Sequence, residues 1–172
     1  EFSKAWNIDT LVGEPLPEHY PLLETLCREY GIRVGVHNHP QENNRYWHPD
    51  KVIEQIAGRD PMIGINPDLG HWMRMGVDPV EQLKRPEVGK RIVGFHFNDV
   101  KELGANKSPH VVPGTGAGRT KEMLELLEKQ GYKGRFTIEH GNWKKNHGEV
   151  CGAIRLFDTA TAELAAVENR GN

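Results

Sequence analysis

The sequence predicts an α/β fold in which helices cover a parallel sheet. Short apolar runs alternate along the chain with stretches of helical periodicity, and this alternation is typical of βα units. The runs are apolar throughout rather than alternately apolar and polar, which indicates strands buried on both faces. Polar side chains that can bind a metal follow several of these runs, at the strand ends where α/β proteins carry their functional sites.

The first half of the chain contains three predicted strands and two predicted helices. Residues 8–12 form a β-rich run that ends at a Gly-Glu-Pro turn, and residues 17–30 then place apolar side chains on one helical stripe before a glycine. The apolar run 33–36 is the second strand, and a polar loop leads from it to a helix over about 50–57. The run 62–65 is the third strand, which an Asn-Pro pair breaks.

The second half of the chain repeats this pattern. A short helix near 79–85 precedes a strand over 91–95, and a long loop rich in Gly, Pro and Lys follows it. A threonine can cap the helix 121–130, which a glycine terminates, and the apolar run 135–138 is the next strand. The last predicted helix covers about 149–168.

Length and composition indicate one globular domain over residues 1–172. Hydrophobic residues make up 37% of the chain and charged residues 27%, which is ordinary for a globular protein. A formal net charge of −2 shows no basic bias, so nucleic acid is not an expected partner. No apolar run is long enough to span a membrane, and no membrane partner is expected. We expect a cytoplasmic protein, or a periplasmic one if an N-terminal signal was removed.

Four of the predicted strands end in residues that bind metals or transfer protons. In chain order these residues are His37, then Asp68 with His71, then His96, and finally Glu139. Because the carboxyl ends of parallel strands meet at one edge of a sheet, we expect a single convergent site. Carboxylates and imidazoles together suit a metal site or an acid/base site. For His37, a hydrogen bond to a neighbouring carboxylate is the structural alternative.

Five short motifs, taken in their order, carry a family resemblance. They are His37-Asn38-His39 with Glu42, Asp68-Leu69-Gly70-His71, the run from Val93 to Asp99, Pro113-Gly114-Thr115-Gly116, and Ile138-Glu139. Each motif alone is weak, but together they resemble the xylose-isomerase-like sugar isomerase/epimerase superfamily, the AP endonuclease family 2 type of TIM barrel. The resemblance covers nearly the whole chain from about residue 8 and implies a (β/α)8 barrel.

The barrel implied by the resemblance is partial. A full barrel of this type needs about 250 residues. With a short strand near 110–113, the chain has about six βα units, which correspond to strands three to eight, so it is the C-terminal three quarters of a barrel without its first two units. An open barrel exposes strand edges, which folded proteins avoid. We therefore expect a homo-oligomer or association with a missing N-terminal segment.

The resemblance also implies a metal centre. Asp68, His96 and Glu139 would be ligands of a divalent cation, Mn²⁺ or Mg²⁺, with Co²⁺ or Zn²⁺ as alternatives. In many members a glutamate at the position of His37 is the fourth ligand and one of two catalytic carboxylates. Here the resemblance leaves His37, His39 and Glu42 as candidates for the missing ligand or for a general base. We expect Glu139 and His37 to be the catalytic residues.

The remaining site residues would contact the substrate. His71, His39, Glu42, Trp72 and Asp99 are the candidates, with Asp99 able instead to orient His96 or a loop.

Other charged and glycine-rich features are weaker candidates. The glycine-rich run 114–118 is either an anion cradle or a plain turn, and the turn is favoured because the Lys-Ser/Thr of a nucleotide loop is absent. Lys101, Lys107 and Arg119 around it could contact an acidic or phosphorylated sugar, although a solvated surface is the default.

The implied reaction is proton abstraction next to the carbonyl of a sugar or keto-sugar through an enediolate, which a divalent ion would stabilise. The expected protein is thus a metal-dependent isomerase or epimerase with a small-molecule sugar substrate. Three alternatives stay open: a keto-sugar dehydratase or lyase, an endonuclease IV-like phosphodiesterase, and a non-catalytic barrel subunit or fragment.

Overall fold

The sheet of this protein consists of parallel strands, as expected. A computed structural model describes residues 1–40, 44–141 and 146–171. Three strands pair in the order β1-β2-β3: Thr10–Gly13, Arg33–Val36 and Ile63–Ile65. Strand β4 (Gly94–Phe97) pairs parallel with β7 (Arg135–Ile138), and bridges at Ile65–Ile92 and Asp68–His96 join β3 to β4. The described parallel strands therefore form one layer in the order β1-β2-β3-β4-β7.

Backbone hydrogen bonds continue this layer beyond the strand ends. The amide of His37 donates to Gly13 O at 2.9 Å, and the amide of His96 donates to Pro67 O at 3.0 Å. At the far strand, the amide of Glu139 donates to Phe97 O at 3.1 Å. These bonds hold the residues that follow the strands in register, so their side chains meet at the carboxyl edge of the sheet.

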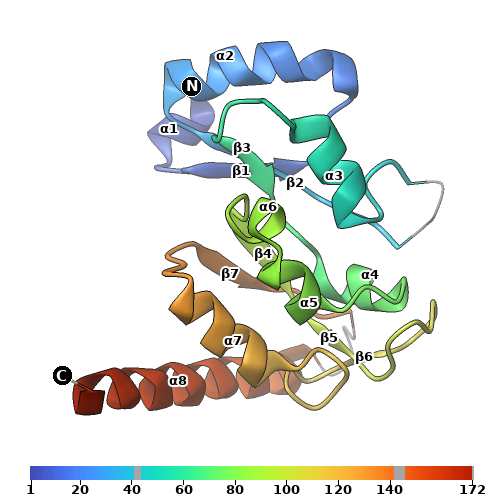
Figure 1. Ribbon diagram of the computed structural model, residues 1–172, viewed down its shortest axis with the longest axis vertical. Helices are drawn as coiled ribbons and strands as arrows, with labels where there is room; N and C mark the ends of the chain where they lie inside the picture. The colour runs from blue at the N-terminus through green and yellow to red at the C-terminus, as the bar shows by residue number, and fades with distance from the viewer. Residues whose placement is uncertain (41–43, 142–145, 172) are drawn as a thin grey trace.

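Helices flank both ends of the layer. Figure 1 shows α2 and α3 beside the β1–β3 end and α7 and α8 beside the β4–β7 end. Prolines occupy the first turns of α2, α3, α5 and α6, where a missing N–H costs no helical bond. The helices are α1 (Phe2–Ala5), the 3₁₀ helix η1 (Pro17–His19), α2 (Tyr20–Tyr30), α3 (Pro49–Ile56), α4 (Leu69–Arg74), α5 (Pro79–Lys84), α6 (Pro86–Gly89), α7 (Thr120–Lys129) and α8 (Asn146–Gly171).

Aromatic packing fixes the β4–β7 end of the core. Phe95 and Phe136 stack with ring centroids 5.3 Å apart, and Phe157 of α8 packs against Phe97 with centroids 4.6 Å apart. Both Phe95 and Phe97 are fully buried, so the long helix α8 is anchored on this sheet through its first half. No helix in the described part of the chain is long and apolar enough to cross a membrane.

The structure corrects the expected strand near 110–113. Residues His110–Val111 form β6, which pairs antiparallel with β5 (Asp99–Val100) and does not join the parallel layer. The described residues therefore contain five parallel strands where six were expected. The cause is local, since the Asp99 carboxylate accepts the amides of Gly114 and Gly116 and folds the loop back on itself.

Two smaller differences concern element boundaries. Strand β4 begins at Gly94 rather than at 91, so His96 lies inside the strand instead of following it. Helices α1, α4 and α6 were not predicted, whereas α5, which is as short as α4, was predicted over 79–85. The strands over 33–36, 62–65 and 135–138 are confirmed, the second beginning one residue later.

Candidate metal centre

Four side chains converge at the carboxyl edge of the sheet. His37, Asp68, His96 and Glu139 each offer a ligand atom, and these atoms all lie within 4.8 Å of one another. Nε2 of His37 is 3.0 Å from Nδ1 of His96, and the same nitrogen of His96 is 2.8 Å from Oε2 of Glu139. The four residues come from the ends of β2, β3, β4 and β7, so the parallel register brings them together.

The carboxylate of Asp68 is held in place from three directions. It is 1% exposed and caps α4 by accepting the amide of His71 at 2.8 Å. The side-chain amide of Asn98 donates to both of its oxygens at 3.1 Å. Asn38 makes two hydrogen bonds to the Asp68 backbone. Its Nδ2 donates to Asp68 O at 3.2 Å, and its Oδ1 accepts a hydrogen bond from the Asp68 amide at 2.8 Å. This carboxylate is therefore preorganised before any ligand binds.

The electrostatics of the centre fit a bound cation. Burial raises the pKa of Asp68, although the hydrogen bonds from His71 and Asn98 oppose that shift. Burial, reinforced by His96, lowers the pKa of His37 to about 4, so its imidazole is neutral and has a free lone pair. A cation would offset the cost of burying the Asp68 charge. Two imidazoles and two carboxylates are a donor set that suits a divalent transition metal.

A fifth residue, Glu14, lies beside this centre and was not singled out from the sequence. Its Oε1 is 2.5 Å from Nδ1 of His39 and 3.9 Å from Nδ1 of His37, and its Oε2 accepts the side-chain amide of Asn44 at 3.0 Å. Glu14 directly follows β1, just as the other site residues follow their strands. That position was the signal in the sequence that could have identified it.

Two further histidines border the four converging side chains. The ring centroid of His39 lies 4.8 Å from that of His37 and 5.1 Å from that of His71. Nδ1 of His71 is 3.7 Å from Oδ1 of Asp68. The structure thus places both expected substrate contacts, His39 and His71, next to the candidate ligands.

Two of the other expected substrate contacts, Trp72 and Asp99, are not part of this arrangement. Trp72 is fully buried and packs in the hydrophobic core, because α4 turns it away from His71, so its expected role as a substrate contact is wrong. Asp99 is also fully buried, and its carboxylate accepts amides of Gly114, Gly116 and Gly118. Asp99 therefore orders a loop rather than contacting substrate. Glu42 lies outside the described residues.

The glycine-rich run 114–118 is a turn that wraps around the carboxylate of Asp99. Three of its amides are already bonded to Asp99, so the described geometry leaves them unavailable to a phosphate. A Cβ on Gly116 would lie 2.2 Å from Val100 O, so the close approach of the two backbones requires glycine there. This confirms a turn rather than an anion cradle.

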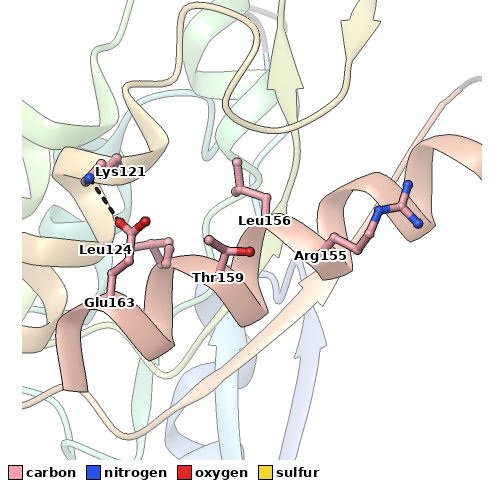
Figure 2. A pocket seen from close by; sticks show the side chains of 7 residues that line it. Lys121, Leu124, Arg155, Leu156, Thr159 and Glu163 are labelled. Carbon is pink, nitrogen blue, oxygen red and sulfur yellow. Dashed lines mark hydrogen bonds and ion pairs between the residues drawn. The ribbon is translucent and has the colours of Figure 1, made fainter. Parts of the chain in front are cut away.

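A separate groove of about 400 Å³ lies between α7 and α8 and shares no residue with the centre (Figure 2). Leu124, Leu156 and Thr159 line it, and an ion pair of 3.1 Å between Lys121 and Glu163 crosses it. It is a packing groove between two helices, without clustered ligand-type side chains.

Parallel strands that bring metal-ligand side chains together at their carboxyl ends define an α/β protein of the open-sheet or barrel type, with its site at the usual edge. The chain belongs to the xylose isomerase-like TIM barrel family, which it matches over residues 21–157. It is 26% identical over 160 residues to an inosose isomerase of Halalkalibacterium halodurans. The alignment covers 81% of this chain and 55% of that protein. The chain spans about half the length of the curated relatives it matches.

Solved structures share the fold. A xylose isomerase domain protein from Planctomyces limnophilus superposes with a TM-score of 0.74 and 20% identity, over 96% of this chain and 62% of its own. A protein called IOLI, crystallised with a bound zinc atom, superposes with a TM-score of 0.73 and 17% identity, over 94% of this chain and 66% of its own. The TIM-barrel fold is confirmed, although the strands in the described part of the chain do not close into a barrel.

Proposed function

We propose that this chain carries the metal-binding active-site residues of an enzyme that isomerises or epimerises a sugar or keto-sugar. The reaction moves a proton at the carbon next to a carbonyl. One observation carries the proposal: the ligand atoms of His37, Asp68, His96 and Glu139 lie within 4.8 Å of one another at the carboxyl edge of the sheet. The inosose isomerase relative supports a substrate of this class. The single domain over residues 1–172 would then be the C-terminal three quarters of the barrel.

Each side chain has an assigned role. Asp68, His96 and Glu139 would hold the cation, and His37 would be the fourth ligand because its neutral Nε2 faces His96. A cation bound there supplies Lewis-acid stabilisation of the charge that develops on the substrate oxygens. Glu139 removes the proton, since its side chain is 53% exposed and its carboxylate reaches both the centre and the solvent. His39, which lies beside Glu14, and its neighbour His71 contact substrate oxygens.

The donor set narrows the expected metal. Two nitrogen and two oxygen ligands favour Mn²⁺, Co²⁺ or Zn²⁺, whereas Mg²⁺ prefers oxygen ligands and retained waters. One structural neighbour was crystallised with a zinc atom and another in complex with magnesium. Mn²⁺, Zn²⁺ and Mg²⁺ are therefore the ions to test first.

A dehydratase or lyase that starts with the same proton abstraction is the nearest alternative reaction. An endonuclease IV-like phosphodiesterase is less compatible, because that chemistry needs several metals and a basic surface. A second ligand group is present in Glu14, His37 and His39, but it shares His37 with the first, so one imidazole would have to serve two ions. The net charge of −2 also disfavours a DNA substrate.

Metal content decides between these functions. We expect elemental analysis of the purified protein to find about one equivalent of a divalent transition ion. Asp68→Asn should lower the affinity for Mn²⁺ by more than about 100-fold. Asp78→Asn is the matched control, because Asp78 caps α5 as Asp68 caps α4 and lies outside the centre. Several equivalents of metal would favour the phosphodiesterase. The absence of bound metal would contradict the proposal.

Proton transfer is tested separately. Metal-loaded protein incubated with keto-sugars in D₂O should introduce deuterium at the carbon next to the carbonyl, and Glu139→Gln should abolish this exchange while the metal stays bound. The product then separates isomerase, epimerase and lyase. Bound metal without exchange on any sugar tested would favour a non-catalytic subunit.

We further propose that a strand-bearing segment covers the free edge of β1, either within a longer polypeptide or from a second copy. In the described residues β1 pairs on one side only, and apolar side chains are exposed there: Leu11 is 45% and Val12 is 44% exposed. Trp6, which precedes the strand, is 70% exposed. Uncovered strand edges and apolar patches favour association. Light scattering that finds a 19.5 kDa monomer with a cooperative melt would contradict this proposal.

A further inference from the structure

Arg74 lies one helical turn beyond His71 on α4, beside the metal centre. Its Nη1 is 3.4 Å from Nδ1 of His71, and its Nε donates to Ser108 O at 3.0 Å. His71 in turn lies 3.7 Å from Asp68. Nδ1 of His71 therefore lies near both the guanidinium of Arg74 and the candidate metal ligand Asp68.

This guanidinium is half-buried and forms no ion pair in the part of the chain that the structure describes, although the charge of Asp68 acts on it at longer range. Arginines such as Arg28, Arg85 and Arg119 each lie within 4.0 Å of a carboxylate, but Arg74 does not. Arg91 is comparably buried, yet its guanidinium donates to three backbone carbonyls. Arg74 donates to one carbonyl and one imidazole, so donors on its fork stay free. A half-buried guanidinium with free donors and only a distant carboxylate is suited to binding an anion.

The neighbouring β5–β6 hairpin adds a second observation. Nδ1 of His110 is buried without a hydrogen-bond partner in the described residues, two positions from the Ser108 carbonyl that anchors Arg74. The charge of Arg74 contributes to the lowered pKa of His110, so the two groups lie within electrostatic range. Polar donors from α4 and β6 are therefore grouped beside the centre.

The other cations near this loop are less suitable. Arg119 is fully engaged by Asp78, Glu81 and Glu122. Lys101 is exposed and lies 3.9 Å from Glu102. Arg74 is thus the cation beside the centre that combines partial burial with free donors.

We propose that Arg74 binds an anionic group, carboxylate or phosphate, on the substrate. This inference rests on the proposed function, because it takes the carbonyl end of the substrate to be at the metal centre. A sugar extending from there past His71 would bring its distal group to the guanidinium fork. The planar fork can donate two parallel hydrogen bonds to either anion, which a lysine cannot do.

Anion binding to the Mn²⁺-loaded protein tests the proposal. We expect calorimetry to show binding of inorganic phosphate or acetate, and Arg74→Gln to weaken it at least about 10-fold while Mn²⁺ affinity is unchanged. Arg155→Gln is the control, since Arg155 is exposed on α8 outside the centre. No anion binding by the wild type, or equal binding by Arg74→Gln, overturns the proposal. Absent Mn²⁺ binding instead counts against the proposed function alone.

Chemical protection gives a result that needs no variant. Phenylglyoxal modifies accessible arginines, and we expect phosphate or acetate to protect Arg74 but not Arg155, as read by peptide mass spectrometry. Unchanged reactivity of Arg74 overturns the proposal. Paired substrates then distinguish the two anions. If the protein turns over a ketose phosphate or a keto-acid sugar, Arg74→Gln should reduce kcat/KM for that substrate at least about 10-fold. The kcat/KM for the matching neutral ketose should stay unchanged.

Discussion

Nε2 of His37 lies 3.0 Å from Nδ1 of His96, and the two imidazoles face each other across the carboxyl end of β3. Asp68 follows that central strand, so its carboxylate joins the pair from between them. Burial and the neighbouring His96 keep His37 uncharged near neutral pH, with a pKa of about 4. Imidazoles that turn nitrogen atoms toward one point are suited to sharing a metal ion.

The first prediction concerns His37 as a ligand. His37→Ala should lower Mn²⁺ affinity at least about 10-fold, because one of four ligands is lost, and His37→Glu should recover most of it by restoring a charged donor. Titration calorimetry measures both, with His19→Ala as a control on an exposed histidine. If His37→Ala binds Mn²⁺ fully but loses proton exchange, His37 is an acid/base or substrate group. Full binding and full exchange would remove it from the site.

The second prediction concerns Asn98, which orients the Asp68 carboxylate. Asn98→Ala removes both hydrogen bonds to that carboxylate and should weaken Mn²⁺ binding by about 10–100-fold. It also removes the acceptor of the buried Gly70 amide, which should cost about 1–3 kcal/mol of unfolding free energy. Calorimetry and urea denaturation measure the two effects. Asn106→Ala, on an exposed position, should change neither, and unchanged metal affinity in Asn98→Ala would rule out the orienting role.

The third prediction separates the Asp99 loop from the metal centre. Asp99→Ala leaves the amides of Gly114, Gly116 and Gly118 without their acceptor and should lower the unfolding free energy by about 2–4 kcal/mol. Because Asp99 does not contact the centre, Mn²⁺ affinity of the folded protein should change less than about 3-fold. Asp158→Ala, an exposed aspartate on α8, is the stability control. A large loss of Mn²⁺ affinity at full stability would restore Asp99 to the site.

The fourth prediction is a pH dependence of stability that arises at His110. Burial, followed by the charges of Arg74, His140 and His71, lowers the pKa of His110 from 6.5 to about 4. The unfolded chain therefore binds a proton between pH 6.5 and 4 that the folded protein does not, so stability falls as the pH falls through this window. Since His110 is only half-buried, we expect its share to be about 1–2 kcal/mol.

Urea denaturation at pH 7, 5.5 and 4.5 checks this dependence. His110→Gln cannot take up the proton and should lose less stability across the window than the wild type. His19→Gln, on an exposed histidine, should follow the wild type. Identical pH profiles for His110→Gln and the wild type would show that His110 is solvated in the folded protein.

The sequence by itself determined the parallel α/β fold and which four side chains converge at the candidate metal centre. Continuous apolar runs mark buried strands, and a parallel arrangement forces all strand ends to one edge. For that reason Asp68, His96, Glu139 and His37 could be expected to meet without knowledge of any contact. Local patterns were sufficient because the strand register alone places these residues.

Only the tertiary structure decided how the surrounding side chains are used. Glu14 and Asn98 acquire their roles through contacts with residues far away in the chain, and no local pattern reports such contacts. Trp72 follows His71 directly, yet the helix turns one side chain into the core and leaves the other at the site. The direction of a side chain depends on the packing of its whole element, whereas the position of a strand end depends on a few neighbouring residues.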